Sequence, residues 1–247
     1  MRACVVIPAL DEASRLASGR VLELLADPDV TLVLVDDGST DGTGAVMQNL
    51  ALRAPGRVRV HALERNLGKA EAVRRGLADG IAQGAWAVGY LDADLAAPPS
   101  ELLRLLGHLR AHPALRAVLG ARVAMLGRDI RRRALRHYCG RVFATAASLA
   151  LGLAVYDSQC GAKVFRVDAT LRGAIAQPFA DRWAFDVELL GRLLRGALGA
   201  PGWPPSAFEE LPLERWHDGG DSKVRLDQAL GATLSLVRLA VRHRLGA

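Results

Sequence analysis

The sequence is poor in cysteine and contains no long apolar run. Its three cysteines, Cys4, Cys139 and Cys160, are widely spread, which excludes a disulfide framework and a zinc cluster and indicates a reducing compartment. The longest uncharged stretch, Val142 to Tyr156, falls short of the roughly 18 residues of a membrane-spanning helix. The apolar run after Arg2 is too short for a signal peptide and has no small-residue cleavage site. We therefore expect a cytoplasmic chain without a spanning helix.

No repeat, linker or low-complexity segment interrupts the chain. Hydrophobic residues make up 51% of the 247 residues, charged residues 23%, and the formal net charge is +6. These values are ordinary for a globular protein and exclude a disordered chain. The length allows one large domain or two small ones. Because no linker is visible, we expect one domain over residues 1–247, with a first half up to 122 and a second half from 123.

Short apolar runs alternate with helical patterns in the first half. The runs are bounded by turn residues and predict buried strands over Cys4–Ile7, Thr31–Val35, Val58–Leu63, Trp86–Leu91 and Ala117–Gly120. Helices are predicted between them, over Glu12–Ala26, Thr43–Arg53, Lys69–Gln83 and Ser100–Ala111. This alternation favours an α/β fold with a mostly parallel sheet and helices on both faces.

The second half has longer helical patterns. Ile130–Gly152 is predicted to form one long helix, basic at its start and apolar later, and Trp183–Leu198 another. Lys163–Arg166 fits a short strand, and Gly199–Pro205 a loop rich in glycine and proline. Leu226–Leu245 has the spacing of an amphipathic helix.

Aspartates follow two of the predicted strands. Asp36 and Asp37 come after the second strand, and Asp92 and Asp94 after the fourth. Ligands of an open parallel sheet bind beyond the carboxyl ends of its strands, and carboxylates gathered there need a cation or hydrogen-bond donors. Oxygen ligands favour a hard ion, Mg²⁺ or Mn²⁺. Asp92 and Asp94 are thus a candidate metal site, with a solvated turn as the alternative.

Two further segments, Asp36–Thr43 and Asn66–Lys69, lie directly before predicted helices. Each is also compatible with an ordinary turn that caps the helix. The second is not a P-loop, because Ala70 follows Lys69 and Leu63 stands where the first glycine would be.

Taken in order, these motifs resemble those of the family 2 glycosyltransferases with a GT-A fold. They are Val6–Glu12, Val35–Thr43, Asn66–Lys69 and Asp92–Asp94. The later segments Asp157–Phe165 and Arg182–Leu190 are similar to polyprenyl-phosphate glycosyltransferases, above all to the dolichyl-phosphate β-glucosyltransferase branch, with mannosyltransferases as close relatives. The resemblance implies an inverting transfer of glucose or mannose from UDP-glucose or GDP-mannose to a polyprenyl phosphate.

The resemblance also implies a donor site. Base, ribose and phosphates would be met by Pro8, Leu10, Glu12, Asp37 and Lys69. Asp11 replaces the usual asparagine, Ala70 replaces a frequent glycine, and Leu95–Pro99 is poor in polar residues. These departures leave the donor sugar open.

On the reactive side, Asp92 and Asp94 would bind the Mg²⁺ or Mn²⁺ ion that bridges the donor diphosphate and stabilises the leaving nucleotide. Arg122 would face the sugar or the acceptor phosphate, Gln159 and Lys163 would lie along the acceptor side, and Lys223 would meet phosphate. Asp186 lies in the segment that holds the acceptor-side acid in this fold. Asp94, Arg122 and Asp186 are the candidate catalytic residues. Glu188 lies in the same segment as Asp186.

The acceptor class decides what Asp186 has to do. A phosphate monoester has a second pKa of about 6 and is mostly a dianion at neutral pH. Unlike an alcohol, it needs no general base to attack the anomeric carbon. We therefore expect Asp186 to orient or tune the site and not to act as an obligatory base.

Arginines crowd the start of the long helix, at Arg128, Arg131, Arg132, Arg133, Arg136 and Arg141. They form either a solvated helix face or a surface for an anionic membrane. Nucleic acid is not expected, since no recognition motif or stacking platform is present. Two alternative functions remain: a family 2 transferase with a soluble acceptor, and a nucleotide-sugar-binding membrane-surface protein without turnover.

Overall fold

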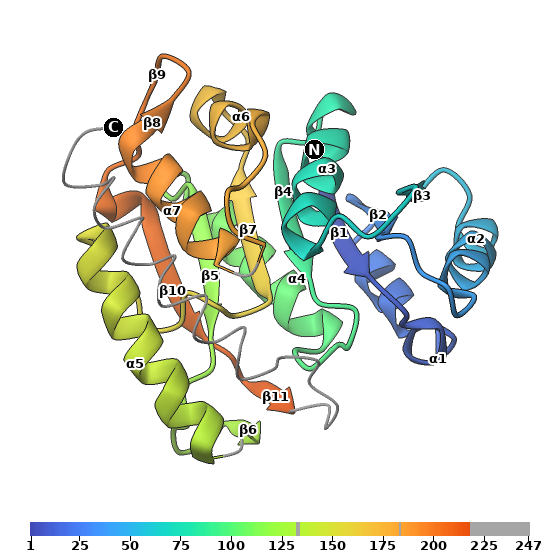
Figure 1. The fold of residues 1–247 in the computed structure, drawn as a ribbon, viewed down its shortest axis with the longest axis horizontal. Helices are drawn as coiled ribbons and strands as arrows, with labels where there is room; N and C mark the ends of the chain where they lie inside the picture. The colour runs from blue at the N-terminus through green and yellow to red at the C-terminus, as the bar shows by residue number, and fades with distance from the viewer. Residues whose placement is uncertain (132–133, 183, 218–247) are drawn as a thin grey trace.

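The centre of the molecule is a seven-stranded sheet in the order β10-β5-β7-β4-β1-β2-β3 (Figure 1). The computed structural model describes residues 1–131, 134–182 and 184–217. The sheet comprises β1 (Ala3–Ala9), β2 (Val30–Asp36), β3 (Val58–Ala62), β4 (Ala87–Leu91), β5 (Ala117–Ala121), β7 (Ala162–Arg166) and β10 (Phe208–Pro212). Only β7 runs antiparallel to its neighbours, β4 and β5. The predicted mostly parallel α/β sheet is confirmed.

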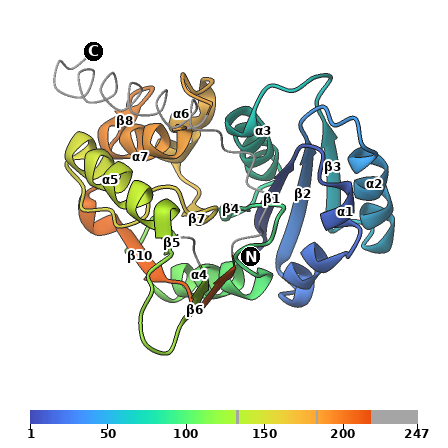
Figure 2. The same cartoon turned by 60° about the horizontal axis from the view of Figure 1, so that its bottom comes forward.

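Helices cover both faces of this sheet (Figure 2). One apolar cluster joins the sheet to α3 (Lys69–Ala82), α5 (Ala134–Leu151), α6 (Ala169–Ala176) and α7 (Phe185–Arg195). The other cluster contains residues of α2 (Thr43–Arg53) and α4 (Pro99–Ala111). Alternate residues of β1 belong to opposite clusters, as the period of a strand requires. Gly76 lets α3 approach β1, since an added Cβ would lie 2.3 Å from Val6 Cγ1.

Two predicted helices were wrong in part. The stretch Glu12–Ala26 is split into α1 (Ala13–Leu16) and the 3₁₀ helix η1 (Arg20–Ala26), because Gly19 adopts a left-handed φ of 68°. The predicted helix Ile130–Gly152 begins later, at α5, because residues 129–131 form β6 (Asp129–Arg131) and pair with β11 (Arg215–His217). Strand pairing outweighs helical periodicity at that point.

The second half contains elements that the periodicity did not predict: α6, β10, β11 and the 3₁₀ helix η2 (Pro205–Ala207). The helix predicted to end at Leu198 ends at Arg195 and is followed by the hairpin β8 (Gly196–Ala197) and β9 (Ala200–Pro201). The predicted helix Leu226–Leu245 lies outside the described residues, as do Lys223, Arg132, Arg133 and Trp183. Within the described part of the chain, no helix has both the length and the apolarity to cross a membrane.

Candidate active site

The carboxyl ends of the central strands bring together the charged residues that the sequence singled out. Asp92 and Asp94 follow β4, Lys69 begins α3, Lys163 lies on β7, and Asp186 lies in the first turn of α7. The charge of Lys69 interacts with Asp92, Asp94 and Asp186. Segments far apart in the sequence therefore form one charged cluster at the sheet edge where an open α/β sheet binds its ligands.

Lys69 and Asp92 form a partly exposed ion pair. Lys69 Nζ lies 2.6 Å from Asp92 Oδ1, and the two side chains are 41% and 34% exposed. Desolvation alone would lower the pKa of Lys69, but the nearby carboxylates, Asp92 first, outweigh it and raise the pKa. The ammonium is therefore fully charged at neutral pH and neutralises Asp92.

Asp94 is the second carboxylate at this edge. Its Oδ1 accepts a hydrogen bond from the Ala96 N–H at 3.0 Å. Desolvation and the negative charge of Asp92 raise the pKa of Asp94 above its ordinary value, and the positive charge of Lys69 opposes this shift. Two neighbouring carboxylates repel each other, and a cation bound between them relieves this repulsion.

The donor set fits a hard divalent ion. Among the described residues, no group of three or more His, Cys, Asp or Glu side chains could hold a metal. An ion at Asp92 and Asp94 would therefore need water and substrate oxygens to complete its shell, which is how Mg²⁺ usually binds beside phosphates. Gly161 makes room for the Asp92 carboxylate, because an added Cβ at position 161 would lie 2.1 Å from Asp92 Oδ2.

A second lysine–aspartate pair, Lys163 with Asp186, is buried, and the charge of its aspartate interacts with Lys69. Lys163 Nζ donates to Asp186 Oδ1 at 2.6 Å and to the Cys160 carbonyl at 2.5 Å. The hydroxyl of Tyr90 donates to the same Asp186 oxygen. Burial and the charge of Asp186 raise the pKa of Tyr90 well above its ordinary value, so that the hydroxyl keeps its proton. Asp186 is thus held from β4 and β7 at once.

Arg122 is engaged by a carboxylate that the sequence analysis did not single out. Its Nε and Nη2 donate to the two oxygens of Asp157 at 2.6 and 2.7 Å, and the guanidinium lies 5.4 Å from the centre of the Trp216 ring. Burial alone would lower the pKa of Arg122, but Asp157 more than compensates and raises it. Glu210 on β10 accepts from the Asp157 N–H at 2.8 Å. The role of Arg122 toward a substrate stays a prediction.

The donor-side residues lie at the ends of β1 and β2. Pro8 is buried, and Leu10 and Glu12 are partly exposed. Asp37 accepts from the N–H groups of Leu67 and Gly68 at 2.8 and 2.9 Å. Burial raises the pKa of Asp37, although these two hydrogen bonds oppose the shift. Asp37 therefore fastens the Asn66–Lys69 turn to β2, and its contact with a base stays a prediction.

Gln159 lies on the loop before β7, next to two of these groups. The buried Nε2 of Gln159 and the buried Oγ of Ser158 have no hydrogen-bond partner among the described residues. Their loop lies between Asp157, which binds Arg122, and Gly161, which adjoins Asp92. This places Gln159 between the predicted acceptor side and the predicted metal site, and its role stays a prediction.

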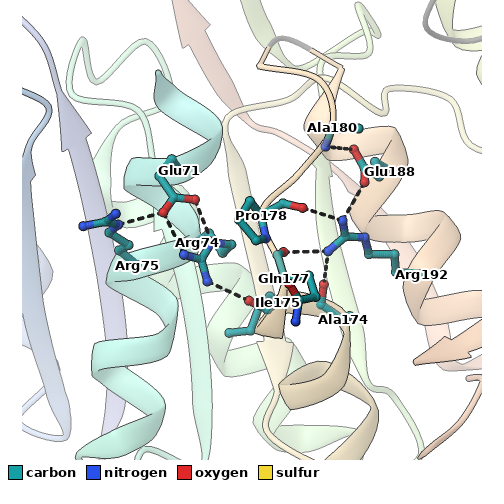
Figure 3. Close-up of polar contacts among 10 residues, drawn as sticks. All are labelled: Glu71, Arg74, Arg75, Ala174, Ile175, Gln177, Pro178, Ala180, Glu188 and Arg192. Atoms are coloured by element: carbon teal, nitrogen blue, oxygen red, sulfur yellow. Dashed lines mark hydrogen bonds and ion pairs between the residues drawn. The ribbon is translucent and has the colours of Figure 1, made fainter. Parts of the chain in front are cut away.

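Figure 3 shows two arginine networks, one on α3 and one on α7, with Ile175, Gln177 and Pro178 between them. On α3, Glu71 accepts from both Arg74 and Arg75, and Arg74 reaches the Ile175 carbonyl at 3.1 Å. On α7, Arg192 donates to the carbonyls of Ala174, Gln177 and Pro178 and to Glu188, whose other oxygen accepts from the Ala180 N–H. These bonds fix the loop that leads to Arg182.

The hollow between these networks measures about 320 Å³ and is bordered by Leu67, Arg75, Phe179 and Arg182, among others. Arg182 also approaches Gly68, since an added Cβ there would lie 3.1 Å from Arg182 Cδ. A larger hollow of about 520 Å³ lies at α6 and the β8–β9 hairpin, among residues other than the charged cluster. The smaller hollow adjoins the candidate site, and the larger one does not.

Sequence reasoning missed three partners at this site: Tyr90, Asp157 and Glu210. Asp157 opens the Asp157–Phe165 motif, so its position was a usable signal. Tyr90 lies two residues before Asp92 on a buried strand and looks like a core residue in sequence. Glu210 belongs to β10, which itself was not predicted.

Comparison with known proteins defines the class. The model of the glycosyl transferase family 2 matches residues 4–172, and the chain belongs to this family. The fold is shared with glucosyl-3-phosphoglycerate synthase of Mycobacterium tuberculosis, solved with Mn²⁺, UDP-glucose and phosphoglyceric acid, at a TM-score of 0.68 and 20% identity over 98% of this chain and 79% of that one. The predicted GT-A fold is therefore confirmed.

Two curated relatives are similar over nearly the whole chain. A dolichyl-phosphate beta-glucosyltransferase of Trichomonas vaginalis is 28% identical over 98% of this chain and 68% of its own length. A polyprenol monophosphomannose synthase of Mycolicibacterium smegmatis is 28% identical over 99% of this chain and 89% of its own length. The predicted resemblance to this branch of the family is confirmed.

Proposed function

We propose that this glycosyltransferase moves glucose or mannose from a nucleotide-sugar to a polyprenyl phosphate, with inversion at the anomeric carbon and with the help of Mg²⁺ or Mn²⁺. The observation that carries the proposal is the cluster of Asp92, Asp94 and Lys69 at the carboxyl edge of the sheet. The two relatives are named for transfer to or synthesis on such lipid phosphates, and the solved neighbour contains Mn²⁺ and UDP-glucose.

Different residues are proposed to bind the ion, to attract the acceptor and to orient the site. Asp92 and Asp94 would hold the ion, which when bound supplies a Lewis acid for the departing diphosphate. Arg122 and Lys223 are proposed to favour the approach of an anionic acceptor. Lys163 is charge-paired with Asp186 at 2.6 Å in a buried environment, which supports an orienting role for Asp186. The acceptor phosphate is already ionised and attacks without transferring a proton to the protein.

A membrane surface is the proposed place of action, at its cytoplasmic face. Tyr138, Val142 and Leu149 are exposed by 69%, 73% and 80%, and their spacing puts them on one face of α5. Leu126, in the loop before β6, is fully exposed as well. An apolar helix face next to arginines is typical of helices that lie on anionic lipid. Arg128 and Arg131 lie between Leu126 and Tyr138 in the sequence.

One assay separates the proposal from its rivals. Radiolabelled UDP-glucose and GDP-mannose are each offered with a polyprenyl phosphate in vesicles, with 3-phosphoglycerate, and with no acceptor, all with Mn²⁺. The proposal expects label to enter the lipid fraction from one donor. Label in a water-soluble product would indicate a soluble acceptor, and donor binding without any product would indicate a binding protein; either result contradicts the proposal.

A further inference from the structure

Lys69 occupies an unusual place for a cation. It is the first residue of α3, where the helix dipole disfavours positive charge. Its stabilisation comes instead from outside the helix, from Asp92 at 2.6 Å and from the charges of Asp186 and Asp94. Glu71, the acidic residue in the first turn of α3, is engaged by Arg74 and Arg75. Helix stability therefore does not account for a lysine at position 69.

The ammonium of Lys69 lies on an oxygen that a divalent ion would use. It contacts Asp92 Oδ1, and the Asp92 carboxylate lies close over Gly161, where an added Cβ would come within 2.1 Å of its Oδ2. A divalent ion at Asp92 and Asp94 and the ammonium of Lys69 would compete for one carboxylate.

We infer that Lys69 occupies the cation position of the site when no nucleotide is bound, and that it thereby couples divalent-ion binding to nucleotide binding. The inference rests on the proposed function for the statement that a nucleoside diphosphate is the ligand. A diphosphate offers the ammonium new oxygen partners, which frees Asp92 for the ion. Because coupling between two ligands is reciprocal, the ion also tightens nucleotide binding.

The surroundings of Lys69 allow this exchange. Its side chain is 41% exposed, and its Nζ lies 6.0 Å from the centre of the Phe185 ring. The charge of Asp186 continues to attract the ammonium when it leaves Asp92. The buried pair of Lys163 and Asp186, with side chains 1% and 5% exposed, has no such freedom and stays fixed during the exchange.

Mn²⁺ binding tests the inference directly. Free and bound Mn²⁺ are measured by electron paramagnetic resonance for the wild type, Lys69→Gln and Lys69→Met, each alone and with saturating UDP or GDP. Arg75→Gln is the matched control, since it removes a cation from the same helix that pairs with Glu71 at 2.7 Å. Asp92→Asn identifies the site. Circular dichroism checks folding, and two neutral replacements of Lys69 guard against a variant-specific defect.

The inference predicts that both Lys69 variants bind Mn²⁺ alone about threefold to fivefold more tightly than the wild type, because a partly exposed ion pair worth up to about 1 kcal/mol no longer competes for Asp92. UDP or GDP should tighten Mn²⁺ binding strongly in the wild type and in Arg75→Gln, but much less in the Lys69 variants. Mn²⁺ affinity that is unchanged, weakened or not measurable in the Lys69 variants would overturn it. So would an Arg75→Gln variant whose affinity for Mn²⁺ alone rises as much as that of the Lys69 variants.

The result is independent of the acceptor. If the Lys69 variants behave as expected and no lipid product forms in the transfer assay, the inference holds and the proposed acceptor is wrong. If lipid product forms but Mn²⁺ binding does not respond to Lys69, the proposed function holds and the inference fails.

Discussion

The site contains two lysine–aspartate pairs with the same contact distance and opposite surroundings. Lys69–Asp92 and Lys163–Asp186 are both joined at 2.6 Å, but the first pair is 41% and 34% exposed and the second 1% and 5%. Asp186 accepts a further hydrogen bond from Tyr90, whereas Asp92 adjoins a second carboxylate, Asp94. Exposure, not contact geometry, distinguishes a pair that can exchange partners from one that cannot.

The difference has a simple energetic origin. Breaking a buried pair leaves an uncompensated charge in a medium of low dielectric, whereas water screens the partners of an exposed pair. The exposed pair therefore suits ligand exchange, and the buried pair suits the positioning of neighbouring groups.

The largest effect is expected from loss of the exposed carboxylates. Asp94→Asn removes a proposed ligand of the divalent ion, and we expect turnover to fall by about a hundred- to a thousandfold, as for other losses of transition-state charge stabilisation. EDTA should have a similar effect on the wild type, and added Mn²⁺ should reverse it. Turnover is measured as radiolabelled lipid product. Full activity of Asp94→Asn in EDTA would contradict the metal site.

Replacing each lysine by methionine should lower the free energy of unfolding far more for the buried pair than for the exposed pair. Lys163→Met leaves Asp186 buried and unpaired and should lower the free energy of unfolding by about 3–5 kcal/mol. Lys69→Met should change it by less than about 1 kcal/mol. Both are measured by urea denaturation. The double variant Lys163→Met with Asp186→Leu should recover much of the loss; equal effects of the two single variants would show that burial does not distinguish the pairs.

Gly161 tests how closely Asp92 must be held. Gly161→Ala places a methyl group against the Asp92 carboxylate and should lower turnover by about a hundredfold, the typical effect of a misplaced reactive group. Gly107→Ala in α4 is the control, because an added Cβ there meets no atom within 4 Å. Similar turnover of the two variants would show that the position of Asp92 is not limiting.

Asp186→Asn should have a smaller effect on chemistry. The acceptor phosphate needs no base, so we expect the folded variant to lose less than about tenfold in turnover. The rate is measured across pH on protein shown to be folded. A loss of several thousandfold, with a pH profile that moves to a new single pKa, would make Asp186 the general base.

The smallest effect is expected for chemical labelling of the two buried cysteines, Cys4 and Cys160. Burial raises the pKa of the Cys4 thiol to about 12 and that of Cys160 to about 11, so very little thiolate is present at pH 8. We expect neither thiol to be alkylated by iodoacetamide in the native protein at pH 8, and both to react in urea. Peptide mass spectrometry follows each cysteine separately. Rapid native labelling of Cys160 would show that the region around Lys163 is open.

Local pattern predicted the first half of the fold because its strands and helices each bury a regular apolar face. The strands β1, β4 and β5 are short, fully buried runs, and β2 is buried except at Thr31. By contrast, β10 carries Glu209 and Glu210 and is only partly buried, so its place beside β5 depends on tertiary pairing. The same holds for β6, where pairing with β11 replaced the predicted start of a helix.

The candidate site was predicted to a similar extent. Residues in ordered motifs, such as Asp92, Asp94 and Lys69, could be found from sequence, and the structure brings them together. Their hydrogen-bonding neighbours could not be found from sequence. Tyr90 resembles an ordinary core residue, and Glu210 lies on a strand whose sequence has no clear apolar pattern. Which of two lysines is buried also depends on packing, and spacing along the chain carries no information about it.

Anomalous diffraction from crystals soaked with Mn²⁺ and UDP would test the central claim most directly. The account predicts one manganese peak bound to Asp92 and Asp94, with Lys69 moved from Asp92 toward the diphosphate and with Lys163 still paired to Asp186. A manganese peak away from these aspartates, or a complex in which Lys69 keeps its contact with Asp92 beside the bound ion, would contradict it.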